Sequence, residues 1–262
     1  MRRDERKRTT SPLSFFYGRG WGLVLAANYF RDSRLAAGYS AVAAKHRHRL
    51  QSATFGMVMA AFEWCIKDYI AQIVSASDLY DGRVEAAKWI DLDKSRILAQ
   101  REATASIGAI LIHPTQGWHD PANLSDRYSE IFERSPIQKS DHETLGQLWI
   151  LRHSIAHNAG FVTNHDAYRL RAPSLSERSV RIDDAFLNDT WGFLMKIVHG
   201  LADPVGTKVL TDWFAQRATG DWEQDRQAYE AVKNIVTLVE SRDQDLPAAD
   251  EAAYHADSEI LT

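Results

Sequence analysis

Residues 140–160 have the sequence SDHETLGQLWILRHSIAHNAG, which predicts a single helix with a signal at each end. Ser140, followed three residues later by Glu143, is typical of a capping box at a helix start. Gly160 stands where a glycine commonly ends a helix. Between these signals an apolar face repeats at helical spacing, formed by Leu145, Leu148, Leu151, Ile155 and Ala159. We therefore expect a helix over 141–159 that packs on other helices.

The same helix carries three side chains suited to chemistry on anions. Arg152 falls inside the apolar sector, while His153 and His157, four residues apart, share its margin. A guanidinium group is costly to bury alone, so Arg152 should face a carboxylate, a phosphate or a cleft. This placement is typical of a binding or catalytic site.

The helix pattern before it contains one conspicuous acid. From Ala53 to Ile66 nearly every residue is apolar or small, apart from Thr54 and Glu63. A carboxylate is seldom enclosed without a cation, so Arg152 is the predicted neighbour of Glu63. Lys67, one turn later, offers the alternative of an ordinary pair on the same helix.

Helical patterns dominate the chain and predict an all-α fold. No hairpin or glycine-rich phosphate loop is expected, and residues 161–180 could form a short helix or an irregular crossing. The expected helices are 34–51, 53–76, 93–112, 141–159, 183–201, 205–217 and 222–240. The expected divisions are a mobile basic arm (1–14), a helical domain (15–202), a C-terminal helical extension packed on it (203–240) and a flexible acidic tail (241–262).

Composition narrows the class of protein. With 262 residues, 45% of them hydrophobic, the chain can bury a substantial core, and its formal net charge of −4 is not that of a strongly basic nucleic-acid binder. The single cysteine, Cys65, rules out an intrachain disulfide framework and suits a reducing compartment. The apolar run over 21–30 is too short for a membrane span, so we expect a cytoplasmic protein without membrane contact.

The motif Arg152-His153-Ser154-Ile155-Ala156-His157, followed by Asn158 and Gly160, resembles the signature of the HEPN superfamily. That signature has an arginine, four to six residues beginning with a polar one, and then a histidine. The resemblance covers about residues 35–200 and implies a HEPN-like antiparallel helical bundle, to which the C-terminal helices are an addition. It also implies a metal-independent RNA endonuclease, commonly homodimeric, that acts in toxin, abortive-infection or anti-phage systems. His153 departs from the asparagine that is common at its position in the family.

Cleavage of RNA without a metal needs a base for the 2′-hydroxyl, an acid for the leaving 5′-oxygen and a cation for the phosphate. We assign His157 as the principal acid/base and Arg152 as the phosphate ligand. His153 supports them, Glu63 orients Arg152, and Asn158 either positions the His157 ring or caps the helix. The expected product is a 2′,3′-cyclic phosphate, and no metal or cofactor is expected.

One motif supplies half of such a site, so a twofold dimer that brings two motifs to one cleft is expected. A neutralising antitoxin or another partner from a defence complex is compatible with this expectation. Three alternatives remain open. The chain could be a catalytically inactive module that binds RNA or a partner protein, or a structural dimerisation domain in a larger defence assembly. Arg152 and Glu63 could also form a buried pair that only fixes helix packing, with the histidines as polar surface residues.

Other residues are weaker candidates for contact with RNA. Lys45, Arg47 and Arg49 form a basic run that could reach phosphates, although a solvated basic surface is the preferred interpretation. Trp118 stands in a loop rich in proline and glycine, from where it could stack on an unpaired base. The nearby His113, His119 and Asp120 lack the spacing of a closed zinc site, so a surface loop is the preferred interpretation.

Overall fold

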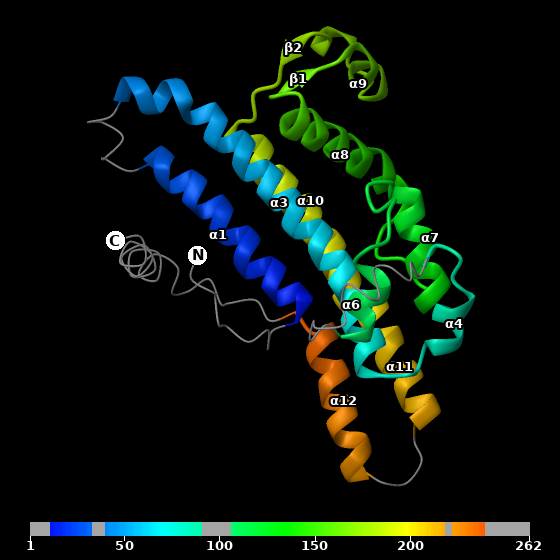
Figure 1. Ribbon diagram of the computed structural model, residues 1–262. Helices are drawn as coiled ribbons and strands as arrows, with labels where there is room; N and C mark the ends of the chain where they lie inside the picture. The colour runs from blue at the N-terminus through cyan, green and yellow to red at the C-terminus, as the bar shows by residue number, and fades with distance from the viewer. Residues whose placement is uncertain (1–10, 33–39, 91–105, 218–221, 239–262) are drawn as a thin grey trace.

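A computed structural model describes residues 11–32, 40–90, 106–217 and 222–238, and confirms the all-α fold (Figure 1). The helices are α1 (Pro12–Asp32), α3 (Ser40–Ala76), α4 (Asp81–Ala86), α6 (Ile107–Ile112), α7 (Pro121–Phe132), α8 (His142–His157), α9 (Asn164–Arg169), α10 (Asp184–Gly200), α11 (Gly206–Arg217) and α12 (Trp222–Val236). Short 3-10 turns cover Lys139–Asp141 and Pro173–Leu175, and a π turn covers Leu201–Val205. The two strands are β1 (Phe161–Val162) and β2 (Arg178–Ser179).

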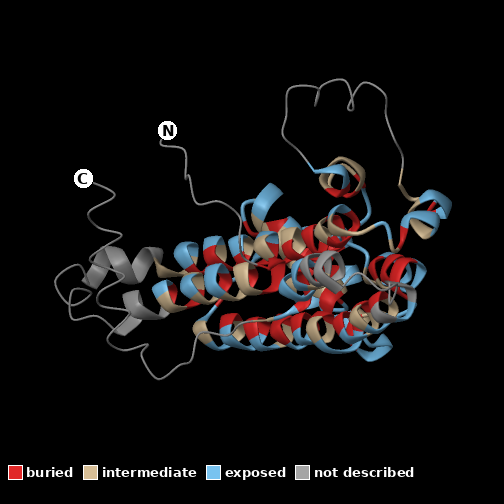
Figure 2. Ribbon diagram, turned by 90° about the horizontal axis from the view of Figure 1, so that it is seen from below, coloured by how far each residue is buried: buried red, intermediate tan, exposed pale blue. Residues whose placement is uncertain are grey.

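Three long helices, α1, α3 and α10, lie side by side and form the body of the molecule (Figure 1). Their inward sides are buried and their outer sides exposed, as expected for amphipathic helices around one core (Figure 2). Aromatic rings join all three: the ring of Phe16 lies 5.8 Å from that of Phe62 and 5.1 Å from that of Trp191. Gly20 allows this approach, because a Cβ there would lie 2.4 Å from the Trp191 ring.

Helix α3 corrects the prediction of two helices over 34–51 and 53–76. Residues 33–39 lie outside the described part of the chain, and the rest forms one helix from Ser40 to Ala76. Neither Gln51 nor Ser52 breaks a helix, and the Gln51 side chain donates to Asp184 Oδ1 at 2.5 Å. The polar pair therefore marks a contact with α10 and not an interhelical break.

Helices α6 and α7, before the motif, also differ from expectation, and no predicted helix covers α1 or α4. Helix α6 starts at its own N-cap, Ser106, so the predicted helix over 93–112 is not continuous, and 91–105 lie outside the described residues. Helix α7 was not predicted. It begins at Pro121, after Asp120 accepts hydrogen bonds from the backbone N–H groups of Ala122 (2.8 Å) and Asn123 (3.0 Å).

The predicted helix over 141–159 is α8, but the predicted capping box is wrong. A 3-10 turn ends at Asp141, the N-cap, which makes no capping side-chain bond. Its carboxylate instead accepts two hydrogen bonds of 2.8 Å from Lys196, and Glu143 pairs with Arg171 at 2.7 Å. The helix ends at His157, and two left-handed residues follow it, Ala159 (φ 53°) and Gly160 (φ 86°).

Residues 161–182 form a small unit at the end of α8, here called the α9 lobe (Figure 1). It contains an antiparallel pairing of β1 with β2, which corrects the expectation of no β-hairpin. Short strands of two residues leave no detectable alternation in a sequence. The lobe is fixed to α8 by a second core made of Ile150, Val162, Ala167 and Leu170.

The C-terminal helices share the main core rather than forming one of their own. Buried side chains of α11 and α12, among them Trp213 and Ile235, belong to the same cluster as α1 and α3. The predicted arm over 1–14 was wrong at its end, because α1 starts at Pro12 and Leu13 is fully buried. Residues 1–10 and the predicted acidic tail lie outside the described chain. Of the helices that are described, none has the length and apolarity needed to cross a bilayer.

Candidate functional site

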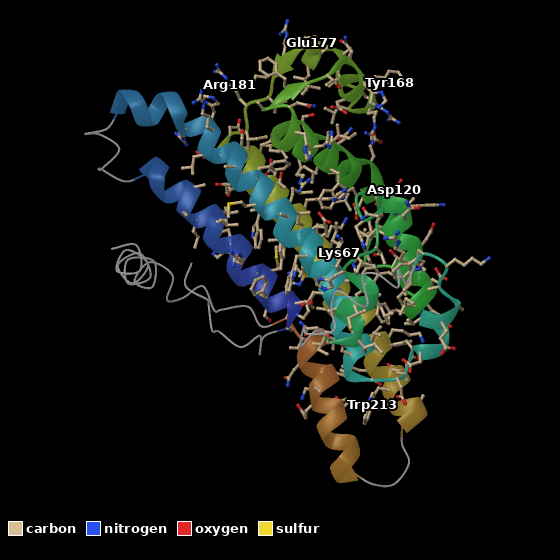
Figure 3. All side chains as sticks on the ribbon, in the orientation of Figure 1. Lys67, Asp120, Tyr168, Glu177, Arg181 and Trp213 are labelled. Carbon is tan, nitrogen blue, oxygen red and sulfur yellow. The ribbon has the colours of Figure 1, made fainter. Side chains whose placement is uncertain are left out.

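A pocket of about 190 Å³ lies on the surface of α8, beside α9 and the loop that precedes α7. Figure 3 labels Tyr168 and Asp120, the chain neighbours of two residues in its wall. The residues that line the pocket are His119, Trp149, Ile150, Arg152, His153, His157 and Arg169. Its charged and titratable lining is thus three imidazoles and two guanidinium groups, without a carboxylate. Such a lining favours an anion.

Helix α8 supplies the motif side chains with the geometry that their spacing predicts. Arg152 is half-buried, whereas His153 and His157 are exposed. The two imidazole rings lie one turn apart with their centroids separated by 4.7 Å. Ser154, on the opposite side of the helix, is fully buried and donates to the Asp166 carboxylate at 3.3 Å. This buried contact fixes the rotation of α8 that turns Arg152 and His157 toward the pocket.

His119 brings a third imidazole to the pocket from outside the motif. Its Nε2 lies 2.8 Å from Oε2 of Glu63, and its ring centroid lies 4.7 Å from that of Trp149. An ionised carboxylate can only accept a hydrogen bond, so Nε2 carries the proton and donates it. This leaves Nδ1 as the His119 nitrogen that can take up or release a proton. The arrangement is that of a carboxylate-oriented acid/base.

Glu63 is held by a lysine and a histidine, and neither is the predicted Arg152. Lys67 Nζ lies 2.5 Å from Oε1, which confirms the alternative of a pair within one helix, and His119 binds Oε2. The predicted ion pair with Arg152 was therefore wrong. Burial alone would raise the pKa of Glu63, but the hydrogen bonds from His119 and Lys67 outweigh it and lower the pKa to about 2. Glu63 and Arg152 are related only through His119, which contacts the first and shares the pocket with the second.

The lowered pKa of Glu63 predicts an effect on stability in acid. Because the folded pKa is about 2, against an ordinary value of 4.5, the carboxylate stabilises the fold above about pH 4.5 and loses this contribution as the pH falls toward 2. We expect Glu63→Gln to lower the free energy of unfolding at pH 7 by about 1–3 kcal/mol, and to have no effect near pH 2. Urea unfolding across this range measures the difference. Glu177→Gln, on the exposed surface of the α9 lobe, is the control for removing one acid. Parallel pH curves for wild type and Glu63→Gln would contradict the assignment.

Two predicted RNA contacts lie away from the pocket, and a third cannot be placed. Arg47 forms an ion pair with Asp184 and so links α3 to α10. Arg49 is exposed on α3, and the side chain of Lys45 lies outside the described part of the structure. Neither Arg47 nor Arg49 lines the pocket.

Trp118 corrects a prediction more directly, because it is only 1% exposed and cannot stack on a base. Its Nε1 donates to Thr115 Oγ1 at 2.6 Å, and the Arg127 guanidinium lies 4.7 Å from its ring centroid. The same guanidinium lies 4.9 Å from the ring of Trp89. Trp118 therefore anchors the loop that carries His119.

Asn158 takes the second of its two predicted roles. It is the C-cap of α8, where its N–H donates to the Ser154 carbonyl at 3.0 Å and its carbonyl accepts from Phe161 at 2.9 Å. Other parts of the described chain offer less chemistry. Two larger hollows, of about 460 and 440 Å³, lie at the ends of α3 and α10 and hold no comparable basic cluster. Within the described residues, no group of three or more histidine, cysteine or acidic side chains could hold a metal ion.

The motif spacing located the α8 part of the site, but His119 and Arg169 were not assigned to it. The Trp118-His119-Asp120-Pro121 segment did contain a helix-start signal, in Asp120 and Pro121, that could have placed His119 beside a helix end. No sequence pattern indicated that Arg169 would line the pocket. Comparisons of the chain with protein-family models, curated proteins and solved structures find no match.

Proposed function

We propose that the protein is a metal-independent endoribonuclease that cuts RNA at the pocket on α8. The observation that supports this most strongly is the joint lining of the pocket by Arg152, Arg169, His119, His153 and His157. A phosphodiester is an anion, and its cleavage needs both a proton donor and a proton acceptor near neutral pH. The resemblance of the motif to the HEPN signature extends the proposal to a ribonuclease of the toxin or anti-phage type.

The two guanidinium groups act on the phosphate. Arg152 is half-buried and therefore less screened by solvent than Arg169, which is exposed on α9. A guanidinium group can donate two parallel hydrogen bonds to phosphate oxygens. Arg152 thus stabilises the charge that accumulates in the transition state, and Arg169 binds the substrate from the other element of the wall.

The imidazoles move the protons. One of them removes the proton of the 2′-hydroxyl, whose oxygen then bonds to phosphorus as the bond from phosphorus to the 5′-oxygen breaks. A second imidazole gives a proton to the departing 5′-oxygen. The products are a 2′,3′-cyclic phosphate and a 5′-hydroxyl end, and no water or metal enters the balance of this step.

His157 and His119 are suited to these two tasks because they come from different elements of the wall. His119 is oriented by Glu63, whereas His157 is exposed and has the neighbouring ring of His153 against it. His153 supports His157 by fixing its ring. Glu63 is a positioning residue for His119, which replaces its earlier assignment to Arg152.

The active species in this proposal is a homodimer in which the two motifs face a common cleft. His153 and His157 are both exposed, so a second copy can approach the pocket without unfolding any element. A twofold axis beside α8 would oppose two Arg152 and two His157 side chains across one RNA strand. Such a cleft would also exclude water from the phosphate, which strengthens each charge interaction.

Cleavage in the presence of a chelator tests the proposal. We expect the wild-type protein to cut an unstructured RNA in excess EDTA and to leave 2′,3′-cyclic phosphate ends, identified by mass spectrometry of the fragments. Binding without any cleavage would instead favour the inactive RNA-binding module. Neither binding nor cleavage, at any pH between 5 and 9, would overturn the proposal.

A further inference from the structure

The outer face of α9 is an unexplained feature beside the pocket. The helix packs on α8 with Asp166 and Ala167, which are 5% and 1% exposed. Its opposite face presents His165, Tyr168 and Arg169, which share one side at helical spacing. Tyr168 is 82% exposed, the highest value among the large hydrophobic side chains of the described chain. Figure 3 shows it at the edge of the α9 lobe.

The exposed ring of Tyr168 lies beside the pocket. Its chain neighbour on the same face, Arg169, lines the pocket, and His165 lies one turn before Arg169. An open aromatic ring thus stands next to a cationic group that can hold a phosphate. This combination is typical of surfaces that bind single-stranded nucleic acid, where bases stack on aromatic rings while cations follow the backbone.

We propose that Tyr168 stacks on the base of the nucleotide next to the phosphate held in the pocket, so that the substrate is unpaired RNA. The inference rests on the proposed function and adds the substrate class to it. A base in a duplex is stacked on its own neighbours and cannot present a face to Tyr168 without being flipped out. An unpaired base can turn outward while its phosphate stays with Arg152 and Arg169.

The surroundings of Tyr168 favour RNA over a protein as the occupant. Its two partners on the face are a histidine and an arginine, and neither has an ion-pair partner within the described residues. Exposed acids are few on the lobe: Glu177 lies at its outer tip in Figure 3, away from Tyr168. The charge next to the ring is thus complementary to a phosphate backbone.

Binding and cleavage of matched RNAs test the inference. The wild-type protein is compared with Tyr168→Ala and Tyr168→Phe on a single-stranded oligonucleotide, on the same strand annealed to its complement, and on strands that lack one base beside the cleavage position. We expect Tyr168→Ala to raise the Kd for the single strand about 5- to 100-fold. Tyr168→Phe, which keeps the ring, should retain wild-type affinity.

The abasic strand makes the test specific. Removing the stacked base should weaken binding by the wild-type protein as much as Tyr168→Ala does, and the variant should show no further loss on that strand. Equal Kd values for wild type and Tyr168→Ala, or equal cleavage of single strand and duplex, would overturn the inference while leaving the ribonuclease intact. Loss of self-association in Tyr168→Ala with unchanged RNA binding would also overturn it, and would assign the face to a second copy. If the wild-type protein neither bound nor cleaved RNA, the proposed function itself would be refuted.

Discussion

Replacing His157 by alanine should lower the rate of RNA cleavage about 10²–10⁴-fold, because the reaction loses a positioned proton donor or acceptor. The change should leave the fold intact, since His157 is exposed at the last turn of α8 and alanine favours a helix. Single-turnover cleavage of an RNA oligonucleotide measures the rate, and thermal unfolding checks the fold. A His157→Ala protein as active as wild type would sink the assignment.

Substitutions of Arg152 test phosphate binding separately from proton transfer. Arg152→Ala should reduce cleavage to a similar extent, whereas Arg152→Lys keeps the charge but loses the two-pronged donor and should recover only part of the activity. Arg178→Ala removes an exposed arginine of the α9 lobe that does not line the pocket, and it is the matched control. Equal losses in Arg178→Ala and Arg152→Ala would point to general charge attraction rather than to a site.

Mixing the two inactive variants examines whether the site is shared between copies. A mixed dimer of Arg152→Ala with His157→Ala keeps one intact arginine and one intact histidine, contributed by different chains. We expect measurable activity to return on mixing, and light scattering to give twice the mass of one chain. If activity does not return although mixed dimers form, each chain works with its own pocket and the common cleft is wrong.

Local geometry explains why part of the site could be predicted from the sequence. The relation of Arg152 to His157, and of Glu63 to Lys67, depends only on the pitch of a helix, so spacing along the chain is sufficient. The contact between Glu63 and His119 joins two different elements, so spacing along the chain cannot predict it. Lys67, His119 and Arg152 were all chemically acceptable, and only the packing of the loop before α7 brings His119 within 2.8 Å.

The fold, like the site, could be predicted only in part from the sequence. Helices α8 and α10 were found, whereas α7 was missed although its apolar residues are more clearly confined to one face than those of α8. Its start signal, Asp120-Pro121, lies in a segment rich in proline and glycine that was interpreted as a loop. The break expected within α3 failed for the opposite reason. Polar residues there serve a contact with α10, which no pattern within one helix can show. The first error came from a local signal that was not used, and the second from a tertiary contact, which propensity does not contain.

Trp118→Ala should lower the free energy of unfolding by about 3–5 kcal/mol, the usual cost of removing a buried tryptophan side chain. Trp118 is 1% exposed, and the Arg127 guanidinium and the Lys67 ammonium lie 4.7 and 5.9 Å from its ring centroid. Lys67 in turn binds Glu63, which orients His119. The variant should therefore lose activity through the displaced loop as well as stability, and urea unfolding together with cleavage of the folded fraction measures both.

Tyr168→Ala provides the matched contrast, since it removes an aromatic ring that is 82% exposed instead of 1%. It should change the free energy of unfolding by less than about 0.5 kcal/mol, as surface substitutions usually do, and yet weaken binding of single-stranded RNA. Trp118→Phe should recover part of the lost stability, because it fills most of the space without the hydrogen bond to Thr115. If Trp118→Ala were as stable as wild type but bound RNA as poorly as Tyr168→Ala, Trp118 would have to leave the core and stack on the base itself. The opposite pattern, stability lost at Trp118 and affinity lost at Tyr168, would separate the residue that holds the His119 loop from the residue proposed to bind RNA.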